Sequence, residues 1–101
     1  MNTERSALFL MANLGSEVAR FLSALEGGDR ILAEGALGRA KEILSKLSAL
    51  DEMKPRQPEL AILEDVITDF ASQPRRYAVR SEEIRNYFAP FALRMVEQAE
   101  G

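Results

Sequence analysis

The sequence predicts an all-α protein that folds as an antiparallel, up-down-up-down four-helix bundle. Four segments carry apolar residues at alternating spacings of three and four, the period of an amphipathic helix, and none follows the period of two expected of a strand. Glycine or proline lies in each stretch between these segments, which favours turns there. Short links between long helices place consecutive helices antiparallel. Residues 1–101 are therefore expected to form a single domain.

The first two helices are predicted to form a hairpin from about Ala7 to Leu50 on which the rest of the chain packs. Their core-facing residues are expected to be Ala7, Met11, Leu14, Val18, Phe21 and Leu25, followed by Ala33, Leu37, Ala40, Leu44 and Leu47. At Gly27-Gly28, glycine permits the positive φ that ends a helix and reverses the chain. Asp29 then offers a side-chain oxygen to cap the second helix, predicted over about 30–50.

The third helix is predicted to follow a proline-containing linker over residues 51–58. Pro58 suits the first turn of a helix, where its missing N–H costs no hydrogen bond. The helix is expected to continue to about Ser72. Its buried stripe consists of Leu60, Leu63, Val66, Ile67 and Phe70. Three acidic residues are expected to face away from this stripe: Glu64, Asp65 and Asp69.

The fourth helix is predicted to begin at Ser81, whose hydroxyl is followed by two acidic residues in the first turn. Its apolar stripe is Ile84, Phe88, Phe91 and Met95, with Tyr87 at the edge. Pro90 lies inside this helix and removes one backbone hydrogen bond. A kink is therefore expected at Pro90.

Composition excludes several kinds of chemistry. The chain has no cysteine and no histidine, which removes disulfides, thiolate metal sites and histidine base catalysis. We therefore expect no catalytic residue, no cofactor and no bound metal, and a magnesium ion held by carboxylates stays as the remaining enzymatic alternative. The net charge of −3 argues against a general nucleic-acid coat protein.

The N-terminal region shows neither a signal peptide nor a membrane span in this pattern. No uninterrupted apolar run approaches the roughly 18 residues that a spanning helix needs. Asn2 or Thr3 is expected to cap the first helix. Together with the absence of cysteine, these features favour a cytoplasmic protein that makes no membrane contact.

An arginine cluster is expected at one end of the bundle, because the predicted topology places the first turn and the third loop together. The loop of residues 73–80, here called the arginine loop, carries three arginines. The predicted cluster consists of Arg30, Arg75, Arg76 and Arg80, with Tyr77 among them. Guanidinium groups and an aromatic ring suit a phosphate or an RNA backbone. In the alternative interpretation, nearby acids neutralise the arginines: Asp29, Glu82 and Glu83.

Self-association is the preferred functional hypothesis, through one of two surfaces. Phe9 and Leu93 fall on the far side of their helices from the core stripe. They are expected either to pack on each other or to form an exposed apolar patch. Gly35 and Gly38 give the second helix a smooth outer face where another helix could approach closely. The sequence therefore predicts a non-enzymatic interaction module, with a homodimer favoured.

The alternative hypothesis is a nucleic-acid-associated protein. Arg85-Asn86 resembles the opening of the Arg-polar-x-x-x-His motif of HEPN ribonucleases, which are four-helix bundles. Pro90 occupies the position of the histidine. The resemblance therefore implies an RNA-associated bundle that lacks the catalytic residue.

Overall fold

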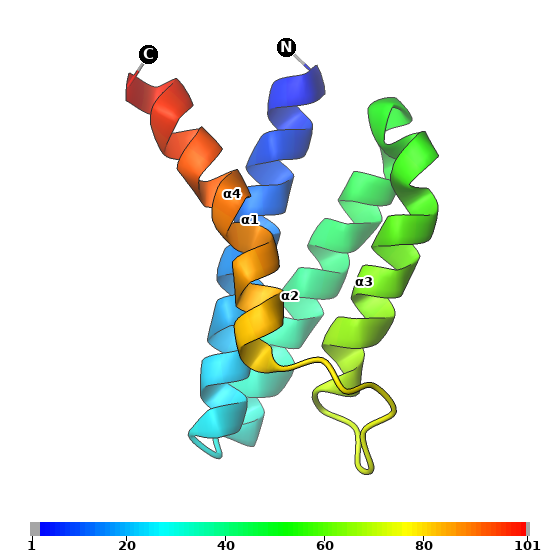
Figure 1. Cartoon of the computed structure of the whole chain (residues 1–101), viewed down its shortest axis with the longest axis vertical. Coiled ribbons are helices and arrows are strands. Elements are labelled where there is room, and N and C mark those ends of the chain that lie inside the picture. The colour runs from blue at the N-terminus through cyan, green and yellow to red at the C-terminus, as the bar shows by residue number, and fades with distance from the viewer. Residues whose placement is uncertain (1–2, 101) are drawn as a thin grey trace.

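The structure, a computed structural model, describes the backbone of residues 3–100 and the side chains of residues 6–98, and it confirms the four-helix bundle (Figure 1). The helices are α1 (Thr3–Glu26), α2 (Arg30–Ala49), α3 (Gln57–Asp69) and α4 (Ser81–Glu100), with a short 3-10 helix, η1 (Asp51–Arg56), between α2 and α3. Their directions alternate along the chain (Figure 1). Strands are absent from residues 3–100. The predicted cap at Asn2 or Thr3 lies outside the described side chains.

The turn between α1 and α2 follows the predicted chemistry. Gly28 has a φ of +73°, a conformation that costs glycine little. The N–H of Asp29 donates to the carbonyl of Ala24 at 2.9 Å, which satisfies one of the last carbonyls of α1. The side chain of Asp29 accepts a hydrogen bond from the N–H of Leu32 at 3.1 Å and so caps α2.

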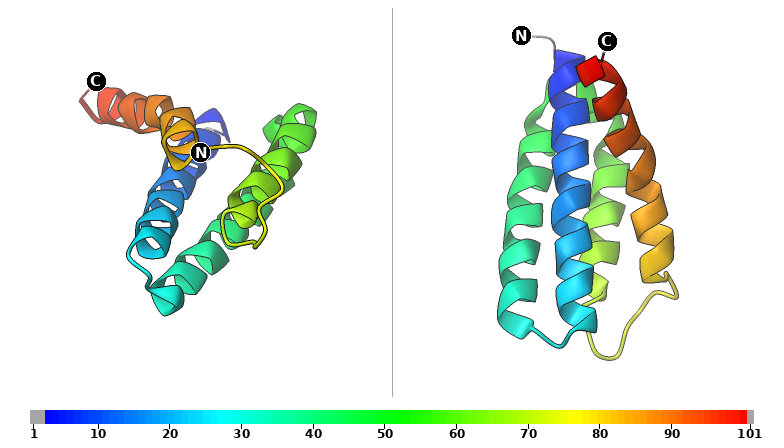
Figure 2. Two further views of the ribbon diagram at one scale, coloured as in Figure 1. Left: turned by 60° about the horizontal axis from the view of Figure 1, so that its bottom comes forward. Right: turned by 90° about the vertical axis from the view of Figure 1, so that its left-hand side faces the viewer.

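The core lies around α1, which packs against both α2 and α4 (Figure 2). Leu14, Leu44, Leu63 and Phe88 come from four different helices and share one cluster of buried residues. Because each large apolar side chain contributes roughly 1.5–3 kcal/mol when fully buried, this shared interior is the main source of stability.

Gly15 sets the distance between α1 and α4. A Cβ atom placed on this glycine would lie 2.8 Å from Cβ of Phe88, closer than two carbon atoms can approach without displacement. The sequence pattern did not single out this residue, although it lies at the edge of the apolar stripe of α1. Glycine here lets α4 lie directly on the backbone of α1.

The predicted linker over residues 51–58 is wrong in its conformation, because residues 51–56 form η1. Met53 is buried within it, at 3% exposure, and its N–H donates to the carbonyl of Leu50 at 3.0 Å. The side-chain amide of Gln57 donates to the carbonyl of Ser48 at 2.9 Å. The segment is ordered because it places an apolar side chain in the core.

Helix α3 ends at Asp69, earlier than the predicted end at Ser72. Beyond Asp69, the N–H groups of Phe70, Ala71 and Ser72 each donate to the carbonyl three residues earlier. This tightened pattern is typical of a helix that is ending.

Helix α4 is packed along its first half and largely exposed along its second. Ile84 and Phe88 are buried, whereas Met95 is half-buried and most residues around it are exposed. Pro90 lies inside the helix, and the second half leans away from α1 (Figure 1). The lean agrees with the kink expected of an internal proline.

Candidate functional site

The arginine loop is bound to carboxylates within the chain. Nε of Arg75 donates to Asp69 at 3.3 Å, and Nη2 of Arg76 donates to Asp65 at 2.7 Å. Nε of Arg80 donates to Glu83 at 3.1 Å. Each arginine of the loop therefore already has an anionic partner, which offsets the charge available to a phosphate.

Asp69 is the residue that holds this loop in place, and its predicted exposure is wrong. It is only 1% exposed. Its carboxylate accepts the backbone N–H of Arg76 at 2.8 Å and that of Tyr77 at 3.1 Å. Arg75 adds its side-chain hydrogen bond, and the guanidinium of Arg75 also stacks on Phe70 at 4.0 Å from the ring centroid. The loop folds over Asp69, so the carboxylate is buried and fully hydrogen-bonded.

Hydrogen bonding shifts the ionisation of these groups. The backbone N–H of Arg76 is the largest cause that holds the pKa of Asp69 below its usual range, and it acts against the burial of the carboxyl. The hydroxyl of Tyr77 donates a short hydrogen bond to Asp65, which lowers the pKa of Asp65 and raises that of Tyr77. Both carboxyls are thereby stabilised as anions beside the arginines.

The neutralising acids are partly those that the sequence suggested. Glu83 pairs with Arg80, but Asp29 is used as the cap of α2. Glu82 makes no ion pair with the described side chains, those of residues 6–98. Asp65 and Asp69 provide most of the compensation, from α3.

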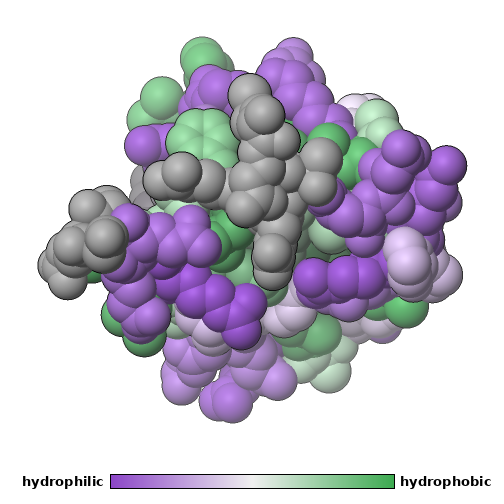
Figure 3. Space-filling view, turned by 90° about the horizontal axis from the view of Figure 1, so that it is seen from above, coloured by the Kyte–Doolittle hydropathy of each residue, from purple (hydrophilic) through white to green (hydrophobic). Residues whose placement is uncertain are grey.

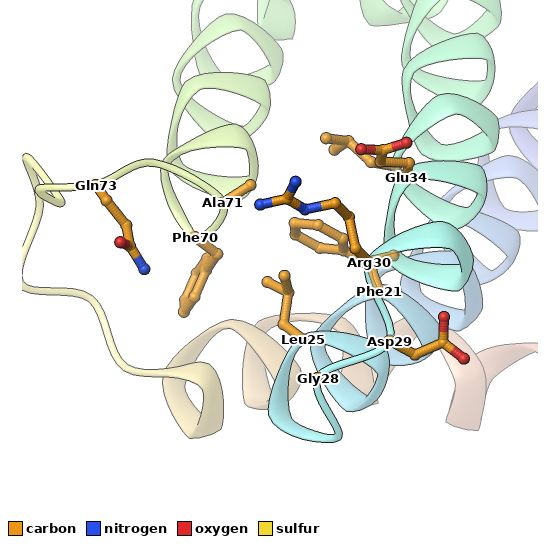
Figure 4. Close-up of a pocket in the computed structure, with 11 residues that line it drawn as sticks. Phe21, Leu25, Gly28, Asp29, Arg30, Glu34, Phe70, Ala71 and Gln73 are labelled. Atoms are coloured by element: carbon orange, nitrogen blue, oxygen red, sulfur yellow. The ribbon is translucent and has the colours of Figure 1, made fainter.

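Arg30 lies at the same end of the bundle but does not join the carboxylate-bound cluster of Arg75, Arg76 and Arg80. It lines a cleft between the first turn of α2 and the end of α3, together with Phe70, Ala71 and Gln73. Figure 4 shows its guanidinium extending across this cleft. Within the described residues, its side chain makes no ion pair or hydrogen bond. The predicted five-residue cluster is therefore divided into a paired loop and a separate arginine.

A second hydrogen-bonded cluster joins α3 to α4, which do not pack on each other along their lengths within residues 3–100. The hydroxyl of Tyr87 donates a short hydrogen bond to Glu59. Arg56 donates to the same carboxylate from Nε at 3.1 Å and from Nη2 at 2.6 Å. Burial is the main cause that raises the pKa of Tyr87 to about 12, and the hydrogen bond to Glu59 adds to it.

Alkaline solution is expected to weaken this link. The unfolded chain loses the phenol proton of Tyr87 near its ordinary pKa of about 10, whereas the folded chain keeps it until about pH 12. Stability contributed by this group is therefore complete below pH 10 and lost between pH 10 and 12. We expect the loss of unfolding free energy over this range to be smaller in Tyr87→Phe than in the wild type, by roughly 1 kcal/mol after allowance for solvent screening. Urea titrations at several pH values measure it, and equal pH slopes for the two proteins would contradict it.

Phe9 and Leu93, the two apolar residues predicted to lie outside the core stripe, are both exposed. Phe9 is 52% exposed and Leu93 is 60% exposed, and Val96 beside Leu93 is 54% exposed. The other predicted surface, around Gly35 and Gly38, is exposed as well. A Cβ on Gly38 would meet nothing within 4 Å, and one on Gly35 would meet only Nη1 of Arg39 at 3.4 Å. Packing within the chain therefore does not require glycine at either position.

Arg85, which carries the resemblance to the HEPN motif, is bound to α1. Its Nη2 atom donates to Glu26 at 2.9 Å and lies 3.5 Å from the hydroxyl of Ser23. The pair links the second turn of α4 to the last turn of α1.

Helix α1 is also long and apolar enough to span a membrane, a property that the sequence pattern did not indicate. Residues 6–26 have the length and the mean hydropathy, 1.3, of a membrane-spanning helix. Counting uninterrupted apolar runs missed this because polar residues such as Ser16 and Glu17 divide the segment. The central helix of a bundle passes the same test, and here one face of α1 is buried in the core while Glu17 accepts a hydrogen bond from Arg39 of α2 at 2.9 Å.

The chain is a small all-α bundle with two hydrogen-bonded polar clusters, several exposed apolar side chains and a cleft beside Arg30. In the part of the chain that the structure describes, no three acidic side chains are grouped so that they could hold a metal ion. Comparisons with protein-family models, curated proteins and solved structures found no match.

Proposed function

We propose that the chain is a non-enzymatic helical-bundle module that forms a homodimer through the end that carries its termini. The observation that carries the proposal is the exposure of three apolar side chains there, Phe9, Leu93 and Val96, each more than half exposed. We call these three residues the apolar end patch.

The three residues lie at similar heights on the bundle. Gly15 and Phe88 mark a level at which α1 and α4 touch. At 1.5 Å per residue, Phe9 lies about 9 Å beyond that level, Leu93 about 8 Å and Val96 about 12 Å. Seen from this end, hydrophobic and hydrophilic residues are interspersed at the surface (Figure 3).

A cleft of about 450 Å³ lies at the same end, between α1, η1 and α4. Its apolar lining residues are Ala7, Leu8, Met53 and Phe91. A twofold interface uses the same surface on both copies, so it needs protruding and receiving features on one patch. The apolar end patch supplies the protruding side chains and this cleft can receive them. This combination favours a second copy of the chain as the partner.

Charge and area are compatible with such a dimer. Arg94 lines the cleft, and Glu97 lies three residues further along α4. The described residues hold no ion pair of either side chain, so a twofold axis would allow Arg94 of one copy to meet Glu97 of the other. A standard interface buries about 800 Å² per partner, roughly an eighth of the 6600 Å² surface of the chain.

The expected result is a mass in solution that rises with concentration from 11.3 kDa towards twice that value. Multi-angle light scattering or sedimentation equilibrium measures it. Leu93→Asp combined with Val96→Asp is expected to give a monomer at every concentration, because a charge in an apolar interface cannot be solvated.

Two control variants test whether the interface lies at this end of the bundle. Ile62→Asp changes an equally exposed apolar residue of α3 and is expected to leave the dimer intact. Gly38→Leu, on the outer face of α2, is expected to do the same. A wild-type monomer at all concentrations would contradict the dimer, and loss of the dimer in Gly38→Leu alone would contradict its placement.

A further inference from the structure

We propose that the cleft beside Arg30 binds a small zwitterion with an apolar body, such as an aromatic or branched α-amino acid. This site lies at the opposite end of the bundle from the apolar end patch and does not depend on the proposed dimer. It rests on three features: an apolar floor, two opposite charges that pair with none of the described side chains, and a suitable volume.

The floor is formed where α3 diverges from the α1–α2 hairpin. Phe21, Leu25, Leu37 and Phe70 line a cleft of about 630 Å³, within the range of small-molecule sites. Phe21 is buried beneath it, and Phe70 is held on the far wall by the guanidinium of Arg75, 4.0 Å from its ring centroid. Both aromatic rings are thus fixed by their surroundings before any ligand binds.

Arg30 and Glu34 give this cleft its two charges. They lie one helical turn apart on α2 and both line the cleft. Residues four apart on a helix can form an ion pair, but these two do not, and neither side chain has another partner among the described side chains of residues 6–98. Figure 4 shows Arg30 reaching across the cleft towards Ala71, with Glu34 on the wall above it.

The third charged residue of the lining, Asp29, does not oppose a ligand carboxylate directly. Its side chain caps α2 and points away from the cleft (Figure 4). The groups that face a ligand are therefore one cation and one anion. A simple carboxylate would gain Arg30 but be repelled by Glu34, and a simple amine would meet the reverse. A zwitterion satisfies both, with its apolar side chain on the floor.

The test uses the full chain and three probes that share one ring: L-phenylalanine, 3-phenylpropionate, which lacks the ammonium, and phenethylamine, which lacks the carboxylate. Nuclear magnetic resonance titration measures their dissociation constants, and shifts at Gly28 and Ala71 report the site. Phenylalanine is expected to bind about tenfold or more tightly than either partial analogue, since each charge-assisted hydrogen bond contributes about that factor.

Matched variants assign the two charges. Arg30→Met is expected to remove the advantage of phenylalanine over phenethylamine, and Glu34→Gln its advantage over 3-phenylpropionate. Ala71→Trp, at an exposed lining residue, is expected to fill the cleft and abolish binding. Lys46→Met, at an exposed residue in the last turn of α2 and so at the opposite end of that helix from Arg30, serves as the control and is expected to leave binding unchanged. Equal binding of the three probes, unchanged binding in Arg30→Met, or no shift at millimolar phenylalanine would each overturn the proposal.

Discussion

Replacement of Asp69 by asparagine is expected to lower the thermal midpoint by roughly 10 °C, the scale on which a domain of this size responds to loss of charge-assisted hydrogen bonds. Asp69 is buried and accepts two backbone N–H groups and the side chain of Arg75. An asparagine has one acceptor oxygen in place of two, and its amide nitrogen would face donors. The arginine loop would therefore lose the anchor that fixes it to α3.

The rate of trypsin cleavage measures the loosening of the loop itself, because trypsin cuts after arginine and the loop contains three arginines. Asp69→Asn is expected to be cut there faster than the wild type under conditions in which the helices remain folded. Asp65→Asn is the matched control, since Asp65 is only half-buried and binds side chains alone. Its effect should be clearly smaller. Equal cleavage rates in all three proteins would show that the carboxylate does not hold the loop.

The carboxylate of Asp69 also makes the free energy of unfolding depend on pH in acidic solution. Hydrogen bonds depress the folded-state pKa of Asp69 below the unfolded value of about 3.8. Its contribution to stability is therefore complete above that unfolded value, and it is lost as the pH falls through the folded pKa. Asp69→Asn should flatten this part of the stability curve.

Replacement of Gly15 by leucine is expected to reduce the free energy of unfolding by about 3 kcal/mol or to detach α4 from α1. The Cβ of any larger residue would lie 2.8 Å from Cβ of Phe88, which is the rigid root of that side chain. Overpacking of this kind typically costs 1–3 kcal/mol, and the branched side chain of leucine adds to it. Leucine favours the helix more than glycine does, so loss of stability would report the contact and not the helix.

Urea titration followed by circular dichroism measures this effect. Gly38→Leu makes the same substitution on α2, where a Cβ meets nothing within 4 Å. It should raise the stability of the monomer by up to about 1 kcal/mol. If Gly15→Leu is as stable as the wild type, the close approach of α1 and α4 is not required by the fold.

Periodicity was sufficient to predict the architecture, because each helix has one apolar face and the faces meet in one core. The roles of Gly28 in the turn and of Asp29 as a helix cap could also be predicted, because both depend only on neighbouring residues. The burial of Asp69 could not be predicted, because it depends on a loop that folds back over this residue. Its helical position lies about 120° from the apolar stripe, which predicts exposure. The available signal was the run of arginines that follows it.

The arginine cluster was likewise predictable in its position but not in its ion pairs. Topology correctly placed the α1–α2 turn and the arginine loop at one end of the bundle (Figure 2). It could not show that α3 supplies the carboxylates for Arg75 and Arg76. Nor could it show that no described side chain supplies one for Arg30. Those pairings depend on how the loop is folded, and periodicity carries no information about that.

The position of α1 between α2 and α4 has a consequence for synthesis of the chain. The ion pair of Glu26 and Arg85 joins residues 59 positions apart. At 5–20 residues per second, the ribosome needs about 3–12 s to add that stretch. Within that time, once α2 is complete at Ala49, the nascent α1–α2 hairpin has no α4 to cover Gly15 and its neighbours. It exposes an apolar surface suited to capture by a chaperone.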